Sequence, residues 1–172
     1  GTELEPAARA QFGRQCIVEG GAIERHDGAI HVRDVDPKDG EVRFHDLGLR
    51  DEVMHGIADI GFKYCSPIQG AVLPHTLQGS DAIGKAQTGT GKTAAFLIGI
   101  FSHLLKNPLD PKKKNTWVAP RAMIMAPTRE LARQIEIDAA LLGKYCEQKV
   151  VCIIGGMDYE KQKRQIQDGV DI

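Results

Sequence analysis

The amino-acid sequence predicts an α/β domain, with a parallel sheet covered by helices on both faces. Short apolar runs alternate along the chain with stretches in which apolar residues recur every three or four positions, the spacing of one helix face. Strands that alternate with helices generally pair in parallel, because each helix carries the chain back across the sheet. Ligands of such sheets bind at the carboxyl ends of the strands, so we expect the functional loops there.

Local signals mark the ends of several predicted elements. Gly61 ends the first helix, and Pro67 begins the second, where a missing N–H costs least. Residues 106–120 contain three prolines and are predicted to be a long solvated loop. The predicted helices cover residues 51–60, 67–77, 93–105, 129–143 and 159–167. The predicted strands cover residues 82–83, 121–126, 149–154 and 170–172.

Residues 1–43 differ from the rest and are predicted to be a loosely ordered N-terminal extension. The stretch 20–40 is rich in Gly and Asp and has few apolar residues, too few for a core of its own. A short strand is possible at residues 29–32. The predicted domain therefore comprises residues 44–172.

Composition and charge exclude several classes of protein. Apolar residues make up 42% of the 172 residues and charged residues 26%, which excludes a disordered or collagen-like chain. The net charge of −1 does not by itself indicate a nucleic-acid partner, so RNA binding would need a shaped site. No apolar run approaches the roughly 20 residues of a membrane helix, and no secretory signal is visible. We therefore expect no membrane contact and a cytoplasmic location.

The cysteines and histidines lack the clustered spacing of metal ligands. No CxxC pair and no HExxH pattern occurs, so we expect reduced thiols and no metal bound by these side chains. The scattered cysteines are Cys16, Cys65, Cys146 and Cys152.

The strongest functional signal is the Gly-rich sequence AQTGTGKT, between a predicted strand and a predicted helix. In that context Gly89 and Gly91 can aim backbone N–H groups at a phosphate, beside the positive end of the helix dipole. Lys92 can reach the β- and γ-phosphates of a nucleotide, and the Thr93 hydroxyl can bind Mg²⁺. The strict phosphate-loop pattern begins with glycine, where this chain has Ala86. The predicted nucleotide-binding residues of this loop are Ala86, Gln87, Thr88, Gly89, Thr90, Gly91, Lys92 and Thr93.

The sequence GFKYCSPIQ, which ends at Gln69, gives a second signal. A glutamine amide carries a donor beside an acceptor, which matches the N6 and N7 edge of adenine. Phe44 stands 17 positions before Gly61, and its ring could cover the face of the base. Alone, this stretch would more simply be a helix cap. Upstream of a phosphate loop, it also fits adenine recognition.

Two further signals follow predicted strands. PTRELA begins with Pro127, and there Thr128 is a plausible helix cap and Arg129 a suitable phosphate partner. Gly155 and Gly156 follow the next strand, where paired glycines let a phosphodiester backbone approach closely. Each is unremarkable alone.

In this order the four signals resemble those of one family, the DEAD-box RNA helicases of superfamily 2. GFKYCSPIQ with the upstream Phe44 resembles the adenine-recognising Q motif, AQTGTGKT is similar to motif I, PTRELA to motif Ia, and Gly155-Gly156 to the GG motif. An initial alanine in motif I is a trait of that family. The Q motif departs from the commonest form, with Cys65 where proline is frequent and Ser66 where threonine is.

The resemblance implies a RecA-like N-terminal domain that binds ATP and Mg²⁺ and couples ATP hydrolysis to local unwinding of RNA. It implies that Lys63, Ser66 and Gln69 contact the nucleotide, and that the PTRELA and GG residues contact the RNA backbone. Finer similarity, in Gly-Val-Asp-Ile at residues 169–172 and in the loop before Arg121, is to a bacterial subgroup that associates with RNA-degrading assemblies.

Parts that the family needs are not found in this sequence. It contains no Asp-Glu-Ala-Asp motif, no Ser-Ala-Thr motif and no second RecA-like domain with arginine fingers. We therefore expect a RecA-like domain cut short before the Asp-Glu-Ala-Asp motif, which binds adenine nucleotide without turnover. Two alternatives stay open: a DNA-directed motor of the same superfamily, and a non-catalytic adenine-nucleotide-binding module.

Overall fold

The computed structural model describes residues 24–26, 29–31, 40–109 and 119–172. Its elements are β1 (Glu24–His26), β2 (Ala29–His31), the short 3-10 helix η1 (Phe44–Leu47), α2 (Asp51–Ile60), α3 (Pro67–Thr76), α4 (Lys92–Lys106), α5 (Arg129–Leu142) and α6 (Tyr159–Gln167). The five predicted helices are confirmed, and each end differs from the prediction by at most one residue. No described helix is both long and apolar enough to cross a membrane.

The helix ends follow from short-range chemistry. Gly61 ends α2 in the left-handed region, with φ of 87°. Pro67 is the first residue of α3. The side chains of Thr128 and Asp158 accept hydrogen bonds from the backbone N–H groups of Leu131 and Lys161, which caps the starts of α5 and α6.

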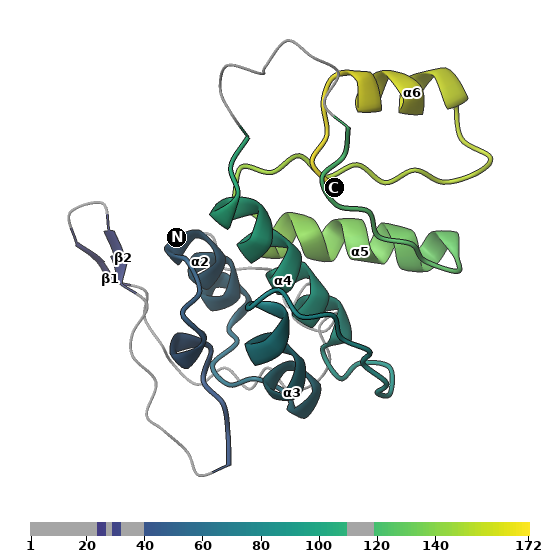
Figure 1. The fold of residues 1–172 in the computed structure, drawn as a ribbon. Helices are drawn as coiled ribbons and strands as arrows, with labels where there is room; N and C mark the ends of the chain where they lie inside the picture. Colours follow the sequence, from purple (N-terminus) through teal and green to yellow (C-terminus); the bar gives the residue numbers. More distant parts are fainter. Residues whose placement is uncertain (1–23, 27–28, 32–39, 110–118) are drawn as a thin grey trace.

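The core lies among α2, α3, α4 and α5, with α4 in contact with each of the other three (Figure 1). Phe101, Leu97 and Ile98 of α4 are fully buried at its centre. Gly56 brings α2 and α5 into backbone contact, since a Cβ atom at this position would lie 2.0 Å from the carbonyl oxygen of Leu142. Figure 1 shows α6 apart from this group of helices, joined to it by extended segments.

The predicted parallel sheet is not confirmed, because the described residues of 40–172 form no strands. The predicted strand segments are extended, and short backbone contacts join three of them. Asp171 accepts hydrogen bonds from the N–H groups of Arg121 and Ala122 at 2.8 and 3.0 Å, and donates to the carbonyl of Lys149 at 2.9 Å. Val151 donates to Ile172 at 3.0 Å. Segment 170–172 thus lies between 121–122 and 149–151, but successive N–H groups share one acceptor, Asp171 O or Lys149 O, instead of forming the regular pairs of a ladder.

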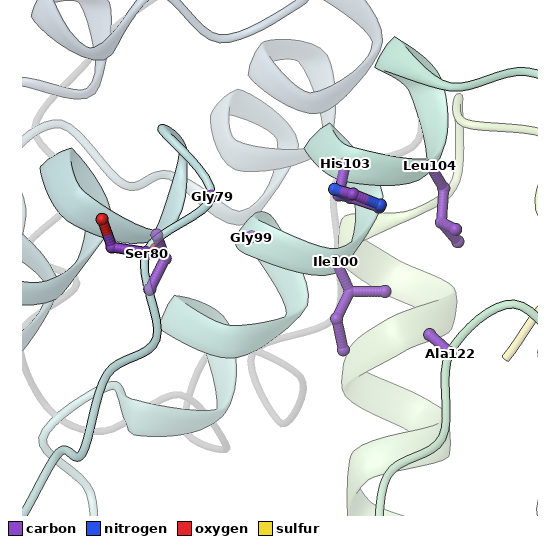
Figure 2. Close-up of a pocket in the computed structure, with 8 residues that line it drawn as sticks. Gly79, Ser80, Gly99, Ile100, His103, Leu104 and Ala122 are labelled. Atoms are coloured by element: carbon purple, nitrogen blue, oxygen red, sulfur yellow. The ribbon is translucent and has the colours of Figure 1, made fainter.

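The predicted strand at 82–83 has no strand beside it, and Ile83 is fully exposed. A groove of about 220 Å³ lies between Gly79 and Ser80, the α4 residues Gly99 and Ile100, and Ala122 (Figure 2). It separates the residues just before segment 82–83 from segment 121–126, so these two predicted strands do not pair.

Arg121 fastens segment 121–126 to the end of α4. Its guanidinium donates to the carbonyl oxygens of Leu104, at 2.9 Å, and Asn107, and forms an ion pair with Asp171 at 3.3 Å. One side chain therefore joins the helix to two of the extended segments.

Part of the N-terminal segment is described. β1 and β2 form an antiparallel hairpin in which Arg25 lies opposite Ile30. The possible strand at 29–32 is confirmed as β2, which covers Ala29–His31, while Val32 and most of the predicted loose extension lie outside the described residues. Residues 110–118 of the predicted loop 106–120 also lie outside them.

Candidate nucleotide and nucleic-acid sites

The loop before α4 folds around the ammonium group of Lys92. The Nζ atom of Lys92 donates hydrogen bonds to the carbonyl oxygens of Ala86 and Gln87. The Thr90 hydroxyl donates to the same Gln87 oxygen at 2.8 Å. The loop therefore satisfies its own lysine through backbone carbonyls.

Two glycines give this loop its shape. Gly89 and Gly91 have φ angles of 81° and 89°, a region that residues with a side chain rarely adopt. Gly91 is the N-cap of α4, so the free N–H groups of the first helical turn open toward the loop. Thr88 is exposed, and Thr93 is half-buried in that first turn. A loop of this form can bind an anion.

Gln69 joins the second predicted motif to this loop. Its Nε2 atom donates to the Gly91 carbonyl at 3.1 Å, and its Oε1 atom accepts from the Ser66 N–H at 2.8 Å. The side chain is 3% exposed. Gln69 therefore caps the start of α3, which is the simpler interpretation of this stretch, and it also contacts the predicted phosphate loop.

The Ser66 hydroxyl faces the same loop. Its Oγ atom is buried and faces the Gln69 N–H in the capping box of α3, but it makes no hydrogen bond of ordinary geometry with the described residues. A Cβ atom on Gly91 would lie 3.1 Å from this oxygen and 2.4 Å from Gln69 Nε2. Since a buried hydroxyl is normally paired, Ser66 Oγ is available to a ligand that enters beside Gly91.

Phe44 lies beside the motif, but inside the core. Its ring is 1% exposed and stacks on Phe62 with centroids 6.1 Å apart. Two backbone contacts hold the segment before Phe44 against the motif. Arg43 and Tyr64 form an isolated β-bridge, and the Cys65 N–H donates a hydrogen bond to the Val42 carbonyl. Phe44 is therefore close to the motif, but its ring is covered in this structure and cannot reach a base without rearrangement.

Lys63 and Cys65 also belong to the sequence GFKYCSPIQ. Lys63 is half-buried. Burial, with a smaller contribution from the charge of Asp46, raises the pKa of the Cys65 thiol to about 12, so this thiol stays protonated at neutral pH.

The two predicted nucleic-acid motifs are brought together. Arg129 is the first residue of α5, and its guanidinium lies over the exposed Gly155-Gly156 pair. A Cβ atom on Gly156 would lie 3.1 and 3.2 Å from the two terminal nitrogens of Arg129, and Gly156 has φ of 79°. Pro127 and Thr128 are exposed beside it. The result is a surface with a cation, a helix N-terminus and a backbone free of side chains.

The starts of α4, α5 and α6 lie toward the same side of the molecule, the right side in Figure 1. Each helix follows a loop that carries one of the predicted motifs. This is the arrangement expected of an α/β domain, in which functional loops gather at one edge.

Other ionisable groups lie away from these loops. Burial raises the pKa of Asp138 on α5 to about 6, against the hydrogen bond that it accepts from Gln134 at 2.8 Å. Within the described ranges, no group of three or more His, Cys, Asp or Glu side chains could hold a metal ion.

Comparison with protein families gives one decisive match. Residues 66–172 match the model of the DEAD/DEAH box helicase family. The chain belongs to this family. The family resemblance expected from the sequence is therefore confirmed.

DEAD/DEAH box helicases with similar sequences include proteins named ATP-dependent RNA helicase RhlB. The relative from Pseudomonas aeruginosa (strain UCBPP-PA14) is 55% identical over 133 residues, which cover 77% of this chain and 33% of that protein. The relative from Vibrio campbellii (strain ATCC BAA-1116) is 52% identical over 132 residues, 77% of this chain and 30% of that protein. The chain thus spans about a third of these relatives, and RhlB is the bacterial subgroup expected from the sequence.

Solved structures of DEAD/DEAH box helicases resemble the fold. The RNA helicase Prp28 from Chaetomium thermophilum, bound to ADP, is 36% identical with a TM-score of 0.61, over 70% of this chain and 28% of that one. A hypothetical ATP-dependent RNA helicase from Sulfolobus tokodaii is 30% identical with a TM-score of 0.57, over 69% of this chain and 31% of that one. These likenesses are consistent with the predicted RecA-like fold.

Two residues near the helicase motifs were not singled out from the sequence. Phe62 stacks on Phe44, and Gln162 of α6 bonds the residue before the paired glycines. The pattern GFKYCSPIQ contains Phe62, but an aromatic residue in a motif does not reveal its stacking partner. Gln162 carries no local signal, because its role depends on contact across eight residues.

Proposed function

We propose that this chain is the adenine-nucleotide-binding part of an ATP-dependent RNA helicase, which couples ATP hydrolysis to local separation of RNA strands. The observation that carries the proposal is the contact between Gln69 and Gly91, which joins the side chain predicted to read adenine to the loop predicted to bind phosphate. The names of the relatives and the ADP bound to Prp28 support the same function.

The residues present fit ATP with Mg²⁺. Gly89 and Gly91 leave two positions of the loop without side chains, α4 directs its N-terminus to the loop, and Ser66 Oγ is a buried polar atom without a hydrogen bond beside it. Lys92 would exchange its two carbonyl partners for phosphate oxygens, and Thr93 would hold Mg²⁺. ATP would supply the phosphoanhydride bond, and the metal would neutralise phosphate charge.

Gln69 has capacity left for adenine. Its amide has two N–H donors and an oxygen with two lone pairs, and the structure uses one donor and one lone pair. The remaining pair matches the N7 acceptor and N6 donor of the base. Because Gln69 and Phe44 are both covered, we expect the segment around them to open when the base enters.

The surface of Arg129, Gly155 and Gly156 is proposed to bind the RNA backbone. A guanidinium pairs with phosphate oxygens in two directions, and the N-terminus of α5 adds positive potential. Thr128 uses its hydroxyl oxygen to cap α5, and Pro127 sets the turn before it. An association with an RNA-degrading assembly in the cytoplasm is a further part of the proposal, drawn from the bacterial subgroup.

The chain alone is proposed to bind adenine nucleotide and RNA weakly, without turnover. Its sequence contains no Asp-Glu-Ala-Asp motif, which the family resemblance makes the source of the carboxylate that would hold Mg²⁺. RNA-stimulated ATP hydrolysis by this polypeptide would contradict this part of the proposal.

Calorimetric titration with Mg-ADP and Mg-GDP tests the nucleotide site. We expect ADP to bind more tightly than GDP, and Gln69→Glu to reduce the difference, because glutamate keeps the acceptor for the Ser66 N–H but loses the donor for N7. A donor of this kind is worth about 1 kcal/mol, or roughly fivefold in affinity. Equal binding of ADP and GDP by the wild type would leave a phosphate site without adenine recognition.

A glycine pair tests the contact between motif and loop. Gly91 and Gly79 both have φ of 89°, but a Cβ atom would collide with Gln69 only at Gly91 and would meet nothing within 4 Å at Gly79. Both changes to alanine should cost about 1–2 kcal/mol of stability from the left-handed backbone. Gly91→Ala alone should also weaken Mg-ADP binding, by about two- to tenfold. Thermal unfolding and calorimetry measure the two effects, and an equal loss of ADP affinity in Gly79→Ala would refute the contact.

A further inference from the structure

The side chain of Gln162 bonds both polar groups of one backbone residue. Its Oε1 atom accepts from the Ile154 N–H at 2.8 Å, and its Nε2 atom donates to the Ile154 carbonyl at 3.2 Å. These are the two bonds that a neighbouring strand would make with Ile154. Gln162 thus serves as a one-residue strand partner at the end of segment 149–154.

Ile154 immediately precedes Gly155 and Gly156, so this bond fixes the start of the glycine turn. The end of the turn is fixed by Asp158, whose side chain accepts from the Lys161 N–H at 3.1 Å and caps α6. Both restraints come from α6, and no residue of α6 is buried. The apolar burial of this helix is limited to the half-buried Ile166, so polar bonds are needed to help fix its position.

The position of the glycine turn matters because of Arg129. The guanidinium lies so close to Gly156 that a single methyl group there would be in tight contact with it. A shift of about 1 Å in such a site is enough to impair recognition. The position of the Arg129 guanidinium relative to Gly155 and Gly156 therefore depends on the two hydrogen bonds that hold Ile154.

We propose that Gln162 is a positioning residue of the RNA-backbone site, which holds Gly155 and Gly156 beside Arg129. It does not need to touch RNA itself. The inference rests on the proposed RNA-binding function and assigns a role in it to α6.

Fluorescence anisotropy with a labelled single-stranded uridine oligoribonucleotide, at fixed low salt, tests the role in this 172-residue chain. Gln162→Met keeps the length of the side chain and removes both bonds, so RNA affinity should fall about five- to tenfold. Gln167→Met, at the exposed end of the same helix, is the matched control and should bind like the wild type. Mg-ADP affinity should not change in either variant.

A double-mutant cycle with Arg129→Ala separates positioning from a general structural effect. If Gln162 acts through Arg129, the double variant should bind RNA no more weakly than Arg129→Ala alone, whereas independent effects would multiply. Multiplied effects, or unchanged RNA affinity in Gln162→Met, overturn the inference while the RNA site stands. Absence of RNA binding by the wild type would overturn the proposed RNA site and the inference with it.

If Gln162→Met fails to fold, Gln162→Glu is the variant that tests the positioning role. Glutamate retains the acceptor for the Ile154 N–H but sets a carboxylate against the Ile154 carbonyl. We expect intermediate RNA affinity and faster hydrogen exchange at the Gly155 and Gly156 amides. Wild-type RNA affinity and exchange in this variant would overturn the inference.

Discussion

Replacement of Lys92 by alanine should weaken Mg-ADP binding by roughly 10- to 150-fold, which corresponds to the 1.5–3 kcal/mol of a charge-assisted hydrogen bond. The change removes the cation that the loop holds between the carbonyls of Ala86 and Gln87. In a full-length protein with the proposed helicase activity, the same change should abolish RNA-dependent ATP hydrolysis, because the phosphates would lose their principal side-chain partner.

Calorimetry on the chain and an ATPase assay on the full-length protein measure these effects. Lys85→Ala is the matched control, because it removes the same charge from an exposed position just before the loop. If both variants lose affinity equally, the loop binds by general positive charge. A Lys92→Ala protein that retains most of its ATPase activity would contradict the assignment of the phosphate loop.

Gly56→Ala should destabilise the chain by about 1–3 kcal/mol or more, the cost of overpacking a core. A Cβ atom here would lie 2.0 Å from the Leu142 oxygen and 2.8 Å from its carbonyl carbon. These are backbone atoms, so no side chain can rotate away, and α2 and α5 must separate. Nucleotide affinity should change only through the loss of folded protein.

Gly99→Ala is expected to stabilise the chain, whereas Gly56→Ala destabilises it. Gly99 lies within α4, and a Cβ atom there would contact the Thr76 hydroxyl oxygen at an ordinary 3.7 Å. Alanine in a helix interior is favoured over glycine by about 0.5–1 kcal/mol. Chemical denaturation of Gly56→Ala, Gly99→Ala and the wild type measures the two changes in the free energy of unfolding. A stable Gly56→Ala protein would show that the close packing of α2 on α5 is not required.

The helices could be predicted because their signals are local. Gly61, Pro67 and Thr128 each act within one turn of the residue concerned, so the sequence alone contains the information. The sheet could not be confirmed in the same way, because a strand needs a partner from elsewhere in the chain. Segment 82–83 has no strand beside it, and its Ile83 is exposed.

The sequence predicts the candidate site residues one by one, but not their mutual contacts. Gln69 and Gly91 were each expected near a nucleotide, yet their direct bond depends on how α3 packs on α4. The burial of Phe44 against Phe62 depends on the same packing. Gln162 was missed because it bonds the backbone N–H and carbonyl of Ile154. Every residue type except proline carries the same two groups, so the identity of the partner gives no signal in the sequence.

Because Gln69 and Phe44 are covered, the affinity of the chain for a nucleotide and its preference for adenine over guanine should depend on different properties. If only a fraction of molecules has this region open, every base that must enter it binds with an apparent dissociation constant raised by the inverse of that fraction. Adenine and guanine would carry the same factor, so their ratio would report the recognition chemistry alone. A low absolute affinity for ADP would then measure the population of the open state, and a mutation that favours opening would tighten both nucleotides without changing the preference between them.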